Sequence, residues 1–113
     1  MLIRFASKKV ERLMADDQLI RAIGLQYAQQ TKKRIRQMQA ASTLFDYLGI
    51  GLGKPHLLKA DKSGLYGVDI TGNFRIIFRP VPDTKQPDVN TSTEIEIIGV
   101  CDYHGGKDNW IIP

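Results

Sequence analysis

The sequence has only one cysteine, Cys101, among its 113 residues. An internal disulfide is therefore excluded, and one cysteine with two histidines cannot form a structural zinc site of the usual kind. No apolar run approaches the roughly 18 residues of a membrane span, and the first residues become charged too soon for a signal peptide. We therefore expect a cytoplasmic protein, neither exported nor membrane-embedded. We expect no metal or nucleotide cofactor either, because the usual phosphate-binding and metal-binding motifs are missing.

Proline is missing from the first half of the chain, because all five prolines lie at position 55 or later. Nothing there interrupts a helix, and apolar steps of three and four predict a single helix over about 18–40. Its apolar stripe comprises Ile20, Ile23, Tyr27, Ile35, Met38 and Ala41. Ser7 is expected to cap a short helix before it, and Ser42 or Thr43 is expected to cap another after it, which carries Leu44, Phe45 and Leu48.

The second half of the chain has the two-residue period of strands. Alternation predicts a hairpin that turns at 71–73, with inward residues Tyr66, Val68, Ile70, Phe74, Ile76 and Phe78. Further strands are expected over 2–5 and 94–103. The proline-rich connection 80–93 is expected to be mobile. The tail 105–113 either covers part of a site or docks on the core.

These elements predict an α+β fold in one domain over 1–113. N-terminal helices should pack on one face of a small, mainly antiparallel twisted sheet, built from a three-stranded meander with the short first strand at an edge. The other face of the sheet should be left free.

Positive charge is concentrated in the first half of the chain. Residues 1–54 hold ten lysines and arginines against four acidic residues, whereas 55–113 hold six against eight. The densest cluster, which comprises Lys32, Lys33, Arg34 and Arg36, can attract a phosphate backbone or an acidic partner. For the cluster alone, a solvated helix face is the favoured interpretation.

Two groups of residues in the second half could handle protons or phosphate. His56 and Lys59 lie three residues apart just before the hairpin. Arg75 and Arg79 share the outer side of a strand, about 13 Å apart. Arginine has the planar fork that matches phosphate. The structural alternatives are a surface loop for the first pair and cross-strand salt bridges for the second.

A third group ends the last strand. Asp102 and His104 should point to one side and Tyr103 to the other, unless a bulge changes the alternation. Tyr103 could instead continue the apolar row of Ile95, Ile97 and Cys101. The structural alternative for the other two is a polar strand end.

Taken together and in order, four motifs resemble those of the HigB branch of the RelE/ParE superfamily. The proteins of this branch are toxins of type II toxin–antitoxin systems. The motifs are the sequences HLLKAD at 56–61, GLYGVDI at 64–70, GNFRIIFR at 72–79 and DYH at 102–104. The resemblance covers most of 56–104, and the helical half is similar only in layout. It implies the RelE-like microbial RNase fold.

The resemblance further implies a metal-independent endoribonuclease that cleaves messenger RNA on the ribosome, by attack of a ribose 2′-hydroxyl on the adjacent phosphate. The implied catalytic residues are His56, Lys59, Arg75, Asp102, Tyr103 and His104. We expect all of them on or beside the sheet face opposite the helices. The implied RNA-binding residues are Asn73, Arg79 and the basic cluster of Lys32, Lys33, Arg34 and Arg36. Implied partners are the ribosome with its message and a helix-turn-helix antitoxin of the HigA kind.

Two other classes of function stay open. A ParE-like relative would keep the fold but inhibit DNA gyrase without nuclease chemistry, which the Asp102, Tyr103 and His104 motif disfavours. A non-catalytic RNA-binding module would explain the charge but not the clustered histidine, lysine and arginine side chains. The two toxin classes are distinguished by measuring whether the protein causes RNA cleavage coupled to translation or DNA breaks that depend on gyrase.

Overall fold

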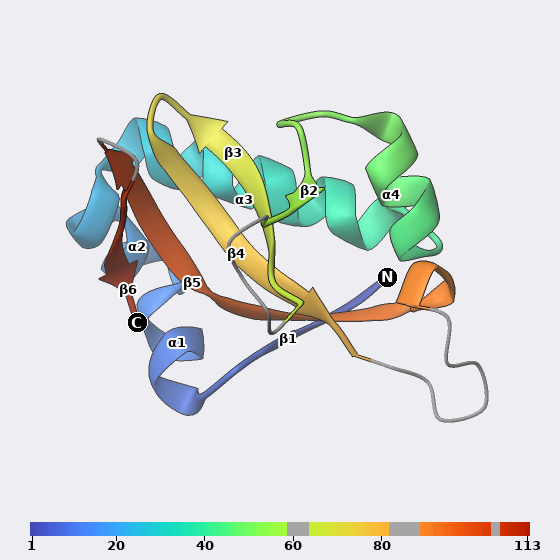
Figure 1. Ribbon diagram of the computed structural model, residues 1–113. Coiled ribbons are helices and arrows are strands. Elements are labelled where there is room, and N and C mark those ends of the chain that lie inside the picture. The colour runs from blue at the N-terminus through green and yellow to red at the C-terminus, as the bar shows by residue number, and fades with distance from the viewer. Residues whose placement is uncertain (59–63, 82–88, 105–106) are drawn as a thin grey trace.

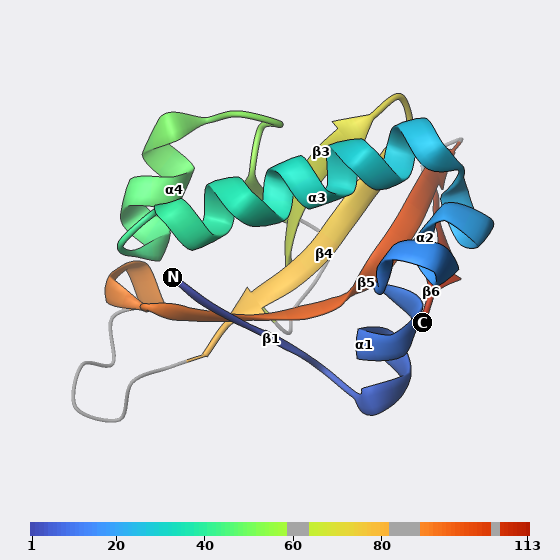
Figure 2. The same cartoon turned by 180° about the vertical axis from the view of Figure 1, so that it is seen from behind.

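Helices occupy the first half of the chain and strands the second, as Figures 1 and 2 show for the computed structural model. The structure describes residues 1–58, 64–81, 89–104 and 107–113. The elements are β1 (Leu2–Phe5), α1 (Lys8–Leu13), α2 (Asp16–Ile23), α3 (Leu25–Ala40), α4 (Leu44–Ile50), β2 (His56–Leu57), β3 (Tyr66–Thr71), β4 (Phe74–Pro80), a 3-10 turn (Val89–Thr91), β5 (Glu94–His104) and β6 (Lys107–Ile112). The predicted α+β class is confirmed. Half of the 80–93 connection, residues 82–88, lies outside the described residues.

The two predicted helix caps are present. The Ser7 hydroxyl accepts a hydrogen bond from the Val10 N–H at 3.1 Å, and the Thr43 hydroxyl accepts one from the Asp46 N–H at 3.2 Å. Each cap satisfies one of the N–H groups that a first helical turn leaves without a partner.

The prediction of one helix over 18–40 is wrong. The helix breaks at Gly24, whose φ of 87° is a conformation that residues other than glycine rarely adopt. Ile20, expected on the apolar stripe, is exposed as a result. The apolar stripe has no member between Tyr27 and Ile35. Thr31 occupies this position: it is fully buried, and its hydroxyl donates to the Tyr27 carbonyl at 2.8 Å.

The sheet has the strand order β1-β5-β4-β3-β2, and β6 also pairs with β5. The predicted β3–β4–β5 meander is antiparallel, whereas β1 pairs in parallel with 94–97 of β5. Along the same edge, β6 runs antiparallel to 100–104. Two strands were not predicted: β2, which carries His56, and β6, which the tail forms by docking along β5.

The helices cover one face of this sheet. In Figure 2, α3 crosses in front of β3 and β4. The rings of Tyr27 and Phe74 meet edge to face at 4.6 Å between centroids. Of the apolar residues on α4, Phe45 is 67% exposed, whereas Leu44 and Tyr47 are buried. The fully buried side chains of the core include Leu19, Met38, Leu44, Val68, Ile76, Phe78, Ile95, Ile97, Val100 and Ile112.

A bulge in β5 determines which residues face the helices. Ile77 pairs with Gly99 but Phe78 pairs with Ile97, so β5 has one additional residue, Ile98. An additional residue reverses the alternation beyond it. The helix-facing row is therefore Ile95, Ile97, Val100 and Asp102, not the expected row through Cys101 and Tyr103.

The sheet face opposite the helices, here called the open face, was predicted to be free but has buried residues. Arg75 and Arg79 lie on it as expected, but Ile77 between them is 1% exposed and Cys101 is fully buried. In the part of the chain that the structure describes, no helix is long and apolar enough to cross a membrane.

Candidate functional site

Two rows of residues cross the open face, which is turned toward the viewer in Figure 1. The strand register places one row across β3, β4, β5 and β6, comprising Asp69, Arg75, Cys101 and Trp110. The second row crosses β2, β3, β4 and β5 and comprises His56, Gly67, Ile77 and Gly99. Directly opposed residues of neighbouring strands point to the same face. The candidate site therefore lies between these neighbouring rows, around Arg75.

Arg75 reaches over neighbouring strands and is half-buried there. A Cβ built on Gly67 would lie 3.3 Å from the Arg75 Cδ and 3.1 Å from a Leu58 methyl group. On the other side, the Arg75 guanidinium carbon lies 4.2 Å from the centre of the Tyr103 ring. The ring face attracts the cation. Gly67 thus leaves room for the Arg75 side chain, and the Tyr103 ring attracts its guanidinium.

His56 lies on the edge strand β2, in register with Gly67, and is exposed. Its Nδ1 lies 2.7 Å from the Lys54 carbonyl oxygen. A carbonyl oxygen can only accept, so Nδ1 carries the proton in this hydrogen bond. In the neutral ring Nε2 is then the nitrogen that can accept a proton.

Tyr103 lies on the open face because of the Ile98 bulge and is 40% exposed. Its backbone N–H donates to the Asn73 carbonyl at 2.7 Å, which fastens the end of β5 to the hairpin turn. Asn73, expected to bind RNA, thus has a structural contact through its backbone, and its side chain remains exposed.

The remaining predicted catalytic residues do not all join this site. Asp102 pairs with Phe74 on the helix-covered face, so the expectation that every candidate lies on or beside the open face is wrong. The bulge exchanged the faces of Asp102 and Tyr103. Lys59 lies outside the described residues, as does the side chain of His104.

Arg79 lies on the open face but belongs to an ion cluster at the other end of β4. Its Nη2 lies 2.8 Å from Glu96 Oε1, and Arg4 Nε lies 3.0 Å from Glu96 Oε2. Burial of Glu96 raises its pKa, but the hydrogen bonds and charges of Arg4 and Arg79 outweigh that effect and hold the pKa below its ordinary value of 4.5. The salt-bridge alternative is confirmed for Arg79.

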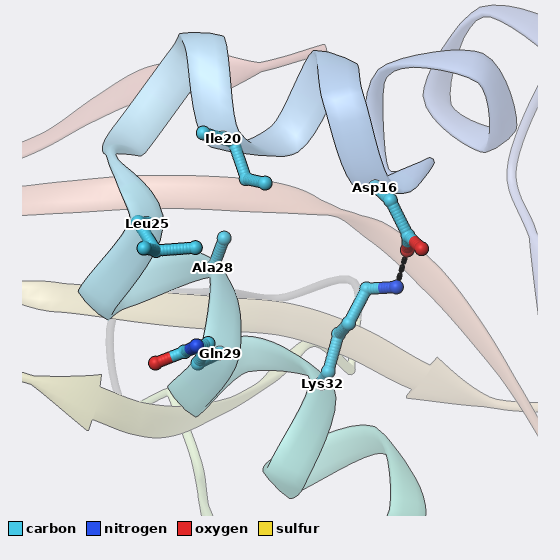
Figure 3. Close-up of a pocket in the computed structure, with 6 residues that line it drawn as sticks. All are labelled: Asp16, Ile20, Leu25, Ala28, Gln29 and Lys32. Carbon is cyan, nitrogen blue, oxygen red and sulfur yellow. Dashed lines mark ion pairs between the residues drawn. The ribbon is translucent and has the colours of Figure 1, made fainter.

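The basic cluster on α3 is divided between two roles. Lys32 pairs with Asp16 of α2 beside a hollow lined by Ile20 and Leu25 (Figure 3). Arg34 turns toward the sheet, where its Nε donates to the Asp69 carbonyl at 2.9 Å.

Two members of the cluster, Lys33 and Arg36, are exposed on α3. The inward position of Arg34 also affects Tyr47. Burial raises the pKa of Tyr47 to about 12, and the charge of Arg34 opposes the rise. Because Lys32 and Arg34 contact other parts of the protein while Lys33 and Arg36 are exposed, the basic cluster is not one uniform RNA-binding face.

Sequence reasoning missed three residues of the site. Asp69 opposes Arg75, which the register of the predicted hairpin could have shown. Gly67 leaves room for the Arg75 side chain, and a glycine inside a strand is itself a sign of close approach. For Trp110 the sequence indicated only that the tail either covers part of a site or docks on the core, because its place depends on the unpredicted strand β6.

In the described ranges, no three His, Cys, Asp or Glu side chains gather as metal ligands would. No family model, curated protein or solved structure matches the chain. The described site offers a fixed guanidinium on Arg75, an imidazole on His56 able to accept a proton, and a phenol on Tyr103 able to donate one. Together these groups suit a reaction at a phosphate diester.

Proposed function

We propose that this protein is an endoribonuclease that cleaves messenger RNA on the ribosome and serves as the toxin of a toxin–antitoxin pair. The observation that carries the proposal is the position of Arg75, whose side chain has room beside Gly67 and whose guanidinium lies against the Tyr103 ring, on the same face as His56. The resemblance of four motifs to HigB-like toxins supports the same activity.

The reaction we propose is an internal transesterification. The ribose 2′-oxygen attacks the adjacent phosphorus, its proton passes to Nε2 of His56, and the bond from phosphorus to the 5′-oxygen breaks. The leaving 5′-oxygen takes a proton from the Tyr103 hydroxyl, which leaves a 2′,3′-cyclic phosphate and a 5′-hydroxyl. Arg75 stabilises the added negative charge on the phosphorane.

The strand order suits this division of roles. His56 lies on β2, Arg75 on β4 and Tyr103 on β5, so the base and the acid flank the cation. Strand spacings of about 4.8 Å give roughly 14 Å between the backbones of β2 and β5. In-line displacement has the attacking and leaving oxygens on opposite sides of the phosphorus, and side chains reaching inward from both strands can serve one phosphate.

The exposure of the site supports ribosome dependence. His56 and Tyr103 are exposed on an open sheet face, so the protein contributes charge and proton transfer more than orientation. Orientation of reacting groups is worth roughly 7 to 11 kcal/mol, which a ribosome holding the message can supply. The exposed side chains of Lys33 and Arg36 can contact ribosomal RNA.

The test is to incubate purified protein with a defined message, either naked or programmed into ribosomes, and to map the new 5′ ends. We expect cleavage only in the programmed ribosomes. Equal cleavage of naked RNA would contradict ribosome dependence. Absence of cleavage in both, with gyrase-dependent DNA breaks instead, would move the assignment to the ParE-like alternative.

The partner we propose is a small helix-turn-helix antitoxin encoded by a neighbouring gene. The basic first half of the chain would attract an acidic partner. We expect the two proteins to co-purify and co-expression to restore growth. A protein that is harmless at high expression and binds no neighbouring product would contradict the toxin assignment.

A further inference from the structure

Trp110 is the single tryptophan of the sequence, and its indole is 47% exposed. It lies on β6, where it pairs with Cys101 of β5. Two residues later, Ile112 is fully buried in the core and pairs with Val100, which holds the strand against β5. A large apolar side chain is thus kept partly in solvent by a strand that is firmly docked.

The register brings Trp110 close to the proposed reaction site. Cys101 lies between Arg75 on β4 and Trp110 on β6, so these two residues are two strand spacings, about 10 Å, apart. Tyr103 is the diagonal neighbour of Trp110, and diagonal Cα atoms lie about 7 to 8 Å apart. The indole and the phenol therefore occupy the same side of the Arg75 guanidinium.

We propose that Trp110 stacks on an unpaired base of the RNA, next to the phosphate that Arg75 holds. This inference rests on the proposed function and adds a substrate-positioning residue to it. A cation beside exposed aromatic rings is the combination by which proteins bind single-stranded nucleic acid, the cation attracting the backbone and the rings receiving bases. An aromatic patch for a protein partner would not need the adjoining guanidinium.

Stacking on one base contributes a factor of about 5 to 150 in affinity. We therefore expect Trp110→Ala to raise the KM for message-programmed ribosomes by a factor in that range, with a smaller change in kcat. Trp110→Phe should recover most of the affinity, because it keeps a ring face. Phe45→Ala is the matched control, since it removes another exposed aromatic ring, from α4 at the far end of the molecule (Figure 1), and should leave KM unchanged.

Thermal unfolding followed by circular dichroism establishes whether each variant keeps its fold. An unchanged KM for a folded, active Trp110→Ala protein overturns the proposal. So does a variant that cleaves normally but escapes neutralisation by the antitoxin, because Trp110 would then belong to a protein interface.

A second measurement does not depend on cleavage. Because Trp110 is the only tryptophan, fluorescence excited at the long-wavelength edge of the tryptophan band, where tyrosine does not absorb, reports on this side chain alone in the unmodified chain. We expect saturable quenching by a single-stranded 2′-O-methyl oligoribonucleotide, which cannot be cleaved, and little quenching by a duplex of the same sequence. If the wild type cuts no RNA, the proposed function fails, and this titration alone decides the stacking: quenching supports it, and an unchanged spectrum overturns it.

Discussion

Arg75 and Arg79 lie on the same strand and the same sheet face, four residues apart, yet their surroundings differ. Arg79 opposes Glu96 and shares that carboxylate with Arg4. Arg75 lies across Gly67 and over the Tyr103 ring. One end of β4 is therefore an ion cluster around Glu96, and at the other end a guanidinium lies against an aromatic ring. We propose that these different surroundings, and not the residue type, give Arg79 a role in stability and Arg75 a role in the reaction.

The same distinction divides the basic residues of α3. Lys32 and Arg34 are engaged with Asp16 and the Asp69 carbonyl, whereas Lys33 and Arg36 are exposed. A charge run in the sequence therefore overstates the number of cations available to a partner. Variants of these residues test whether the cations on β4 and α3 that are engaged within the protein differ in function from the others.

The largest expected effect is that of Arg75→Ala on catalysis. Loss of one group that stabilises a developing oxyanion typically costs about 100- to 1000-fold in kcat, and we expect a decrease of that size in cleavage on programmed ribosomes. Arg79→Ala is the matched control on the same strand and should stay within threefold of the wild type. Equal losses in the two variants would remove the distinction between the ends of β4.

Glu96→Gln should have the converse effect, lowering stability without lowering activity. Glu96 is 6% exposed and holds two arginines, so we expect its loss to reduce the free energy of unfolding by about 1 to 3 kcal/mol. Urea denaturation measures this change, and the cleavage assay provides the control. A large loss of activity at full stability would place Glu96 in the reaction site instead.

The pH dependence of the same variant gives a second test. The folded pKa of Glu96 lies below its ordinary value of 4.5, so the carboxylate stabilises the fold fully above that pH. This contribution is lost as the pH falls through the folded pKa. The wild type should therefore lose its advantage over Glu96→Gln below about pH 4.5. A constant difference in unfolding free energy down to acidic pH would contradict the assignment.

Gly67→Ala should act through the position of Arg75. The added Cβ would lie 3.3 Å from the Arg75 Cδ and 3.1 Å from Leu58, so both side chains must shift by a few tenths of an ångström. We expect about a tenfold decrease in kcat, because small displacements of a charge-stabilising group are costly, and a stability change below about 1 kcal/mol. Unchanged kinetics would contradict the role of Gly67 in positioning Arg75.

The smallest effect is expected from the double variant Lys33→Ala, Arg36→Ala. Each exposed cation that contacts phosphate contributes about one unit to the salt dependence of binding. Ribosome affinity measured between low and physiological salt should therefore fall less steeply for this variant, with kcat unchanged. An identical salt slope would show that α3 does not contact RNA.

Local patterns predicted much of this fold. The period-two spacing located the β3–β4 hairpin, and the hydroxyl residues Ser7 and Thr43 gave the helix starts. Alternation also placed Arg75 on the open face. These features depend on neighbours close in sequence, which is why they can be recognised in it.

The features that the sequence did not predict depend on distant partners. A glycine inside a helix costs only about 1 kcal/mol, so its presence does not by itself predict that a helix ends. The apolar spacing continues on both sides of Gly24, so this helix break could not be identified from the sequence. The parallel pairing of β1 and the docking of β6 need β5 as a template. The Ile98 bulge, which exchanges Asp102 and Tyr103, is visible only in the pairing with β4.

The measurement that tests the central claim most directly is cleavage of a message with a single 2′-deoxy nucleotide at a mapped cleavage position. In the proposed reaction the 2′-oxygen of that nucleotide is the nucleophile, so its removal leaves Arg75 with no phosphorane to stabilise. On programmed ribosomes we predict that cleavage at that position disappears while neighbouring positions are cut as before. Undiminished cleavage at the deoxy position would contradict the account.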